Sequence, residues 1–430
     1  AQAPGSMAQP AQGKSAPWAG TSARSLTKPL GCAAASLAAA VFVFTWSGED
    51  LSAGVDDIRM AEDKNIVRFS EHCSAPGDGV EGVLAQGAEA AAGPQLRAAL
   101  ALLAPGDSSA ARPWPGEAPP GPTWDCRPEA LPRYWRLNKH VRFAAYGPDG
   151  AELTTPFTPD FLPPRPSADA DEPPDEYLCA PSQLTAAGFR QAVFLGRHLA
   201  EAYGGLLGRG SSKHLHVRSV DTKRSLASAV GLLMAFLASP QLVKLFGDGS
   251  EVPIHAWPND TSSSPQIEEM ELGDHLLARW CHQMPWPCHT GFLEGTRCVS
   301  VEQAAERLAK GEAELCRSPP PLGGRHSGPA VLAEEVERLR GAEDGSFALA
   351  SVDGPALAAA LRLLLGGDAV CGDPLSLRPP YASRLVLERW QLPASGEFRW
   401  RVLWNGADVS AKVPGCEGSA APACSEAALR

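Results

Sequence analysis

The second half of the chain alternates between helical and strand-like spacing of its apolar residues. The segment SQLTAAGFRQAVFLGRHLAEAYGGLL (182–207) carries apolar residues at helical intervals, which predicts a helix that begins at Ser182 or Thr185. KHLHVRSV (213–220) alternates in the manner of a strand, and RSLASAVGLLMAFLAS (224–239) returns to the helical spacing. A strand between two helices is typical of an α/β fold.

The C-terminal part continues this alternation and ends in a hairpin. We expect a charged amphipathic helix, a buried strand, a second helix and two strands that form an antiparallel pair closed off by Asn405-Gly406. The segments are PAVLAEEVERLRG (329–341), SFALAS (346–351), PALAAALRLLLGG (355–367), SRLVLERWQ (383–391) and EFRWRVLWNG (397–406). Together they predict a mixed α/β sheet flanked by helices, with an irregular, cysteine-rich helical insertion at about 245–345.

The part of the chain before this pattern is irregular. Residues 49–132 predict a stem outside the globular domain, because eight prolines fall between 104 and 132 and such segments are extended. Within this stem, EAAAGPQLRAALALL (89–103) predicts a short helix. We therefore place the globular domain at 133–426.

The first 48 residues predict a membrane anchor. Residues 1–29 form a basic arm without acids, and residues 30–48 are uncharged and largely apolar. Positive charge before an apolar run is typical of a single-pass type II anchor, with the globular domain in the lumen of the Golgi or the secretory pathway. A cleaved signal peptide, an organelle transit peptide and a buried helix are the alternatives.

Composition narrows the classes of partner. The chain has 430 residues, enough for a large core, and a net charge of −11. Nucleic acids and anionic membrane surfaces attract basic faces, so we expect neither as a partner of the domain. We expect no cofactor and no metal.

The cysteines suggest an oxidising compartment. One of the eleven lies in the apolar run, and several of the others cluster in the C-terminal half. We expect disulfides among them, since extracytoplasmic proteins use cysteine in this way. The candidates are Cys281, Cys288, Cys298, Cys316, Cys416 and Cys424. A zinc site in CHQMPWPCHT (281–290) is disfavoured because the spacing matches no common ligand pair. Asn259, in NDTS, is a glycosylation candidate.

Several segments resemble the histidine acid phosphatases. The helix at 182–207 is similar to their QLTxxGxxQhxxLGxxLRxxY segment, and RSVDTKRSLASA (218–229) is similar to RSTDxxRTxxSA. RPPYASRLVLERWQ and FRWRVLWNGADVS resemble their late hairpin, and the 2-phosphoxylose phosphatase branch is the most similar one. The resemblance implies that family's fold over 133–426 and a phosphorylated sugar as a ligand class.

The chemistry that this resemblance implies is phosphomonoester hydrolysis. In the family, the histidine of RHGxRxP attacks phosphorus, arginines and a later histidine hold the phosphoryl oxygens, and the aspartate of an HD pair protonates the leaving alcohol. Such a transition state needs fixed cationic donors, an in-line nucleophile and an acid opposite it.

This chain departs from those motifs at the decisive positions. RFAAYGP (142–148) matches RHGxRxP without a gap, so that Phe143 replaces the nucleophile and Tyr146 replaces the second arginine. FALASVDG (347–354) matches FALYSAHD, which puts Asp353 at the histidine and Gly354 at the acid, whereas a slip of one residue would put Val352 at the histidine and keep Asp353 as the acid. Losing the nucleophile of a covalent hydrolase costs roughly 10⁶-fold in turnover.

These substitutions predict a pseudophosphatase with a binding, scaffolding or regulatory role. Arg142 and Arg224 match two of the family's arginines, and two buried guanidiniums need a counter-ion. We expect the Asp353 carboxylate to supply it, and we expect a protein or a phosphorylated sugar as the partner. An active sugar-phosphate phosphatase with an unrecognised nucleophile and a structural subunit of a membrane complex are the alternatives.

Overall fold

The computed structural model describes the globular part of the chain. The described residues are 73–75, 79–82, 93–109, 141–153, 183–247, 249–257, 278–279, 281–282, 291–294, 297–300, 303, 306, 310, 328–367, 378–416, 422 and 424–429. All of them belong to one compact unit, Ala61–Arg430. The basic arm, residues 30–48, Asn259, Cys288 and Cys316 lie outside the described residues. Of the helices in the described ranges, none has the length and apolar character that a membrane span needs.

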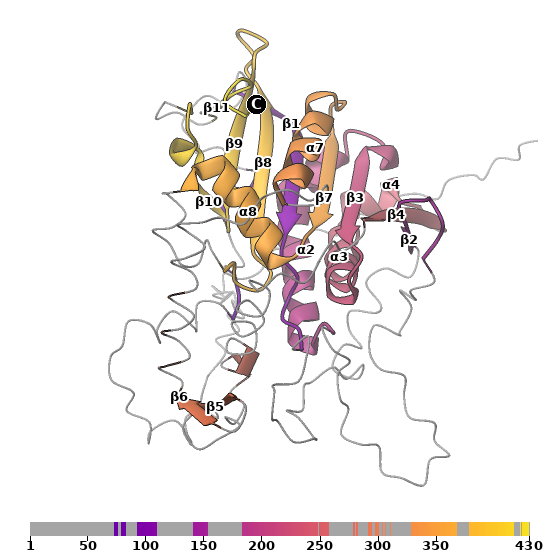
Figure 1. Cartoon of the computed structure of the whole chain (residues 1–430). Helices are drawn as coiled ribbons and strands as arrows, with labels where there is room; N and C mark the ends of the chain where they lie inside the picture. Colours follow the sequence, from indigo (N-terminus) through magenta and orange to yellow (C-terminus); the bar gives the residue numbers. More distant parts are fainter. Residues whose placement is uncertain are drawn as a thin grey trace, which may run out of the picture. The chain divides into compact units, whose positions relative to one another are not determined.

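A mixed sheet of nine strands runs through this unit (Figure 1). Five parallel strands lie in the order β1-β7-β3-β4-β2, and β8 and β9 extend the sheet with antiparallel strands on the other side of β1. The strands are β1 (Gln95–Leu103), β2 (Val141–Tyr146), β3 (Leu215–Val220), β4 (Ser250–Trp257), β7 (Ser346–Ser351), β8 (Arg384–Gln391), β9 (Phe398–Trp404), β10 (Ala407–Asp408) and β11 (Cys424–Ser425). β5 (Gly291–Glu294) and β6 (Arg297–Ser300) form a separate antiparallel pair.

Helices cover both faces of the sheet. The side chains of α2 and α3 pack on one face, and those of α7 and α8 pack on the other. The helices are α2 (Ala186–Leu207), α3 (Lys223–Phe236), α4 (Pro240–Leu245), α7 (Gly328–Arg340) and α8 (Gly354–Leu365), with short 3₁₀ turns at Ser212–His214 and Ser410–Lys412. The predicted mixed α/β sheet flanked by helices is therefore confirmed, as are the predicted helices and strands between 182 and 406.

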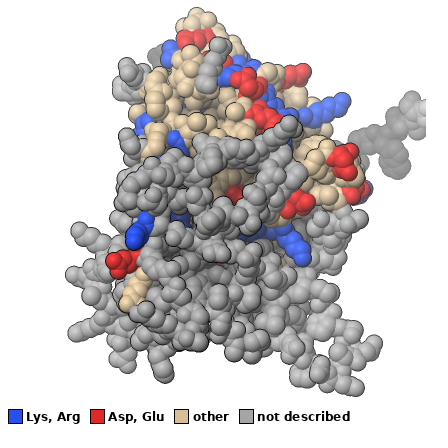
Figure 2. Space-filling model, viewed as in Figure 1, with Lys and Arg blue, Asp and Glu red and all other residues tan. Residues whose placement is uncertain are grey.

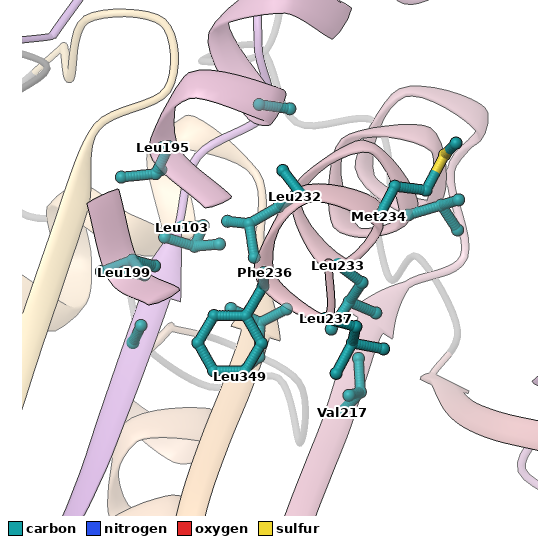
Figure 3. Close-up of a cluster of buried hydrophobic side chains, with 14 of the residues drawn as sticks. Leu103, Leu195, Leu199, Val217, Leu232, Leu233, Met234, Phe236, Leu237 and Leu349 are labelled. Carbon is teal, nitrogen blue, oxygen red and sulfur yellow. The ribbon is translucent and has the colours of Figure 1, made fainter. Parts of the chain in front are cut away.

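Successive side chains of a strand point to opposite faces of the sheet, so the fold has two separate hydrophobic cores. In β1, Ala99, Ala101 and Leu103 face α2 and α3, while the residues between them face α7 and α8. Figure 3 shows the first core, where leucines of α2 and α3 meet side chains of β1, β3 and β7. Phe347 of β7 stacks on Tyr203 of α2 and on Phe236 of α3, at ring-centroid distances of 5.3 and 4.9 Å. Because β1 is apolar on both faces, it reads as a continuous hydrophobic run, which is typical of a central parallel strand.

Two predicted boundaries are wrong. The stem at 49–132 contains β1, which lies in the middle of the sheet with Ala99 to Leu102 fully buried, so this part belongs to the globular domain. The short helix predicted at 89–103 is likewise wrong, because its C-terminal residues form this strand. The insertion at about 245–345 also begins too early and ends too late, since β4 belongs to the main sheet and α7 packs on it.

A short segment ahead of β1 is also bound to the fold. We call residues 73–75 and 79–82 the strap. Its first residue, Cys73, is disulfide-bonded to Cys281. At its other end, the amide of Val80 donates to the carbonyl of Gly406 at 2.9 Å, and the amide of Gly82 donates to the carboxylate of Glu388 at 2.6 Å. The strap therefore joins the part of the chain that precedes β1 to the C-terminal hairpin.

Buried charges hold this end of the strap in place. Arg384 donates to Glu81 at 2.6 Å, and both side chains are almost fully buried. The imidazole of His198, on α2, lies 2.9 Å from the other oxygen of Glu81. Burial acts to raise the pKa of the Glu81 carboxyl, but the hydrogen bond with His198 and the charge of Arg384 outweigh it and lower that pKa to about 2.

A second buried carboxylate adjoins the first. Glu388 accepts hydrogen bonds from Tyr203 at 2.7 Å and from the indole of Trp390 at 3.0 Å, and it pairs with Arg401 at 3.3 Å. Burial raises the pKa of Glu388 in spite of these donors. The groups around Glu81 therefore fully offset the cost of burying its carboxylate, whereas the groups around Glu388 offset that cost only in part.

We expect Glu81→Gln to lower the free energy of unfolding by about 3–5 kcal/mol, because the substitution leaves the guanidinium of Arg384 buried without its charge partner. Urea unfolding followed by circular dichroism measures this loss. Glu343→Gln is the matched control, because Glu343 also pairs with a histidine, His214, at 3.0 Å but its side chain is 81% exposed. This control should change stability by less than about 0.5 kcal/mol, and equal effects of the two substitutions would contradict the role of burial.

The same carboxylate predicts a pH window. A carboxyl whose pKa is lower in the folded state than in the unfolded state stabilises the folded state above the unfolded pKa, and this contribution is lost as pH falls through the folded pKa. For Glu81 the window runs from 4.5 down to about 2. The difference in unfolding free energy between the native chain and Glu81→Gln should therefore shrink steadily over this window. Glu388 contributes with the opposite sign, but it is present in both chains and cancels in the difference. A constant difference between pH 5 and pH 2.5 would rule out the assigned pKa.

Candidate active site

The loop after β1 leaves the sheet where the parallel strands end. Val352, directly after β7, donates its amide to the carbonyl of Leu103 at 2.9 Å, so the ends of β1 and β7 lie side by side. The loops after β1, β7 and β3 therefore share one edge of the sheet, which is where α/β folds bind ligands. We call residues Ala104–Ser109 the site loop, and all six of them are buried.

The backbone amides of the site loop are used inside the protein. Four of its N–H groups donate to protein oxygens at 2.8–3.1 Å, and a fifth residue, Pro105, has no N–H group. The pairs are Ala104 with the carbonyl of Ser383, Gly106 with the hydroxyl of Ser228, Asp107 with the side-chain oxygen of Gln191, and Ser109 with the carbonyl of Gln183. A loop that binds phosphate directs such donors outward at the anion. In this loop the amides donate to oxygens of the protein itself.

Two glycines allow the loop to approach α2. A β-carbon on Gly188 would lie 2.0 Å from the carbonyl oxygen of Asp107, and one on Gly106 would lie 2.4 Å from the carbonyl oxygen of Gly188. Real β-carbons do not come so close to backbone atoms, so both positions require glycine. The site loop and the first turn of α2 are thus in direct backbone contact.

Asp107 is the charged residue of the site loop. Its carboxylate accepts a hydrogen bond from the hydroxyl of Thr185, the residue that caps α2 and accepts from the amide of Gly188 at 3.0 Å. His282 lies 2.7 Å from the same carboxylate oxygen. The side chain of Asp107 is only 4% exposed, whereas that of His282 is 20% exposed. The pair therefore lies at the surface end of a buried polar cluster.

Two disulfides join cysteines within the described ranges, and they involve three of the six candidates. Cys416 pairs with Cys424, and Cys281 pairs with Cys73, which the sequence pattern did not single out. Cys298 lies on β6, Cys288 and Cys316 lie outside the described residues, and their pairing stays a prediction. Because Cys281 directly precedes His282, its disulfide lies next to the Asp107–His282 pair.

The residues predicted to form an anion pocket do not come together. Arg142 lies on β2, at the edge of the sheet, and its side chain is 59% exposed. It pairs with Glu152 and, at 3.1 Å, with Glu251, and its hydrogen bond with Glu152 raises the pKa of its guanidinium. The phenol of Tyr146 also donates to Glu251, and this hydrogen bond raises the pKa of the phenol. This cluster forms a solvated edge of the sheet.

Asp353 and Arg224 have other roles as well. Asp353 caps α8 by accepting from the amide of Ala356 at 2.7 Å, and Gly354 is the first residue of that helix. Arg224 lies in the first turn of α3, partly exposed, and forms no ion pair with any described residue. The predicted pairing of Asp353 with Arg142 and Arg224 is therefore wrong. Phe143, the predicted stand-in for a nucleophile, packs against the core that faces α2 and α3.

Strand order explains why the segment at 142–148 cannot serve this site. Two strands, β3 and β4, separate β2 from β7, so the ends of β2 and β7 are about 14 Å apart at the usual strand spacing. A nucleophile and the residues that hold the same phosphoryl group must lie within a few ångströms of each other. The strands that adjoin β7 are β1 and β3, and the site loop follows β1.

Set against RHGxRxP without a gap, APGDSSA (104–110) shares only the glycine, Gly106. Pro105 falls where that motif has its histidine, and Ala104 and Ser108 fall where it has its arginines. This segment falls in the region that was predicted as a stem because of its prolines. The signal that could have found it is the apolar run QLRAALALL directly before a Pro-Gly pair, which predicts a buried strand followed by a tight loop.

Two stacked histidines lie elsewhere on the sheet, and both have a lowered pKa. His216 of β3 and His255 of β4 lie with ring centroids 5.6 Å apart. Burial, reinforced by Arg338, lowers the pKa of His216 to about 3, and burial also lowers that of His255. Across the described ranges, no three side chains of the metal-ligating types converge.

We expect Gly188→Ala to destabilise the chain by about 1–3 kcal/mol, because the new methyl group would force the site loop away from α2. The expected sign is opposite to that of helix propensity, which favours alanine over glycine by about 1 kcal/mol. Gly205→Ala in the same helix is the matched control, since a β-carbon there meets nothing within 4 Å. Thermal unfolding should show a lower Tm for the first substitution and an equal or higher Tm for the second. A rise in Tm with Gly188→Ala would refute the close backbone contact.

Comparison with known proteins adds structural likenesses at low identity. No family model matches the sequence, and no curated protein matches it. Solved structures with similar architecture include the phytase from D. castellii, with 13% identity, coverage of 88% of this chain and 87% of that one, and a TM-score of 0.43. The phytase from Klebsiella sp. ASR1 has 17% identity, coverage of 72% and 82%, and a TM-score of 0.34. The multiple inositol polyphosphate phosphatase from Bifidobacterium longum, in complex with inositol hexasulfate, has 11% identity, coverage of 82% and 95%, and a TM-score of 0.38. With TM-scores below 0.5, these likenesses carry no argument about the site.

Proposed function

We propose that the chain is a catalytically inactive, phosphatase-like protein with a binding, scaffolding or regulatory role. The observation that carries this proposal is the site loop. It occupies the edge of the sheet beside β7, it contains no histidine and no arginine, and all six of its residues are buried. A phosphoryl group would find neither an attacking nitrogen nor a guanidinium in this loop.

The polar groups of the loop support the same conclusion. Asp107 would place a negative charge beside a bound phosphate, whereas phosphoryl transfer requires cationic donors around the phosphoryl oxygens. The amides that could have bound the anion donate to Ser228, Gln191 and Gln183. Freeing them would leave buried oxygens without donors, at a cost of about 1–3 kcal/mol each.

The compartment and the partner follow from other features. The two disulfides favour an oxidising lumen, and the basic arm followed by residues 30–48 favours a type II membrane anchor in the secretory pathway. On the face shown in Figure 2, acidic and basic residues are interspersed over the described part, a pattern that favours a protein or a sugar over a nucleic acid as partner. Within the family, the motif resemblance supports the 2-phosphoxylose phosphatase branch.

A second candidate function is phosphomonoester hydrolysis through an unusual residue. The observation in its favour is the Asp107–His282 pair, because an imidazole 2.7 Å from a carboxylate is a common acid–base arrangement. The third alternative, a structural subunit that binds partners through residues 49–130, has less support. The strap and β1, which fall in that range, pack on the chain's own fold.

We expect the purified chain to hydrolyse p-nitrophenyl phosphate no faster than buffer between pH 4 and pH 8. An intact histidine acid phosphatase measured in parallel should be faster by roughly 10⁶-fold, the usual cost of removing a covalent nucleophile. Release of p-nitrophenol by the native chain would overturn the proposal. His282→Ala then identifies the source, since loss of that activity in the variant would establish the second candidate.

A further inference from the structure

The Cys73–Cys281 disulfide lies where the strap meets the site loop. Cys281 is bonded to the strap, and the next residue, His282, contacts the carboxylate of Asp107 at 2.7 Å. The backbone amide of His282 also donates to the carbonyl of Ala278 at 3.1 Å, so this short helical turn presents the imidazole as one unit with the cysteine. The disulfide thus anchors the element that covers Asp107.

A second connection joins the same two parts. The side-chain amide of Gln191, on α2, donates to the carbonyl of Cys73 at 2.8 Å, and its oxygen accepts from the amide of Asp107 at 2.8 Å. One glutamine side chain therefore bridges the strap and the site loop. Movement of Cys73 would be transmitted to Asp107 through Gln191 as well as through His282.

The two disulfides differ in how far a reductant can reach them. Cys73 and Cys281 are both partly exposed, whereas Cys416 and Cys424 are 2% and 0% exposed. Thiol–disulfide exchange requires a thiolate to reach one of the sulfur atoms. Of these two disulfides, the one beside the site loop is the accessible one.

We propose that the Cys73–Cys281 disulfide is a redox lock on the site loop. When it is formed, it holds His282 against Asp107 and keeps the loop covered, and when it is reduced, Cys281 and His282 move away and expose Asp107 and Thr185. This inference rests on the proposed function, because it gives the site loop a regulatory role and not a catalytic one. It adds to that function the condition under which the loop is open, which is reduction of this disulfide.

The opening reaction is reduction by a dithiol. A thiolate of the dithiol attacks one sulfur of Cys73–Cys281 and forms a mixed disulfide, and the other cysteine leaves as a thiolate that takes up a proton. The second thiol of the reductant then attacks the mixed disulfide. Two electrons pass to the protein, Cys73 and Cys281 become thiols, and the dithiol becomes a cyclic or linked disulfide.

Hydrogen–deuterium exchange of the full chain tests this lock. The amides of Asp107 and Thr185 are bonded across the loop, so they report its opening. Upon reduction with dithiothreitol, they should exchange at least ~10-fold faster, while the amides of Leu100 and Leu349 in the central strands keep their protection. Cys73→Ser with Cys281→Ser should give the same local acceleration. If that variant does not fold, reduction of the folded native chain remains a sufficient measurement.

Two further variants separate the lock from a general loss of stability. Cys416→Ser with Cys424→Ser removes the Cys416–Cys424 disulfide and should leave exchange at Asp107 and Thr185 unchanged. His282→Ala should accelerate it with the Cys73–Cys281 disulfide intact. Equal exchange in the oxidised and reduced chains, or a simultaneous loss of protection at Leu100 and Leu349, would overturn the lock. The exchange readout does not depend on turnover, so its failure is distinct from the appearance of phosphatase activity, which would overturn the proposed function instead.

Discussion

The direct contact between the backbones of Gly106 and Gly188 is the constraint on which the site depends. Neither position has room for a β-carbon, so the loop after the central strand and the first turn of α2 meet without side chains between them. This contact brings Thr185 and Gln191 of α2 to Asp107. The hydrogen bonds between Asp107 and these two side chains are possible because the backbones lie so close.

The buried charged groups of the chain stabilise two separate connections. Around Glu81 and Glu388, buried arginines and hydrogen-bond donors fasten the strap to the C-terminal hairpin. Around Asp107, neutral donors and one imidazole fasten the site loop to α2. In both places the charged groups stabilise chain connections that are distant in sequence. Groups committed in this way cannot also stabilise charge that develops on a substrate, because that requires donors that are preorganised and unoccupied.

The sequence predicted the elements that have a clear period and missed those that do not. α2, α7 and α8 each have a buried apolar stripe, and α3, although buried nearly all round, has apolar residues at helical intervals, so spacing alone identified them. β1 is apolar on both faces and follows a run of alanines, and a continuous apolar run of this length is compatible with a helix as well as a strand. Its place beside β7 arises from pairing with residues about 250 positions away, which no local pattern contains.

The candidate site was predictable only in part, for a related reason. The strand at 346–351 and the helix that starts near Arg224 were correctly predicted, since both have a clear period. The prediction at 142–148 rests on a seven-residue motif that has lost its histidine and one arginine, so it retains little information. Strand order, which is a property of the whole sheet, separates β2 from β7 and puts β1 and the site loop beside β7. The role of Asp353 was missed because an aspartate before a helix reads equally well as a cap and as a counter-ion.

The central place of β1 has a consequence for the way the molecule holds together. The sheet has β8 and β9 on one side of β1, and β7, β3, β4 and β2 on the other. Within the described sheet, β1 is the strand through which the two groups of strands share backbone hydrogen bonds. A shortened chain that started after residue 132 would therefore contain two half-sheets with facing unpaired edges. Unpaired edges are templates for pairing between molecules. We therefore expect that fragment to self-associate through the exposed edges of β7 and β8 and not to fold as a smaller domain.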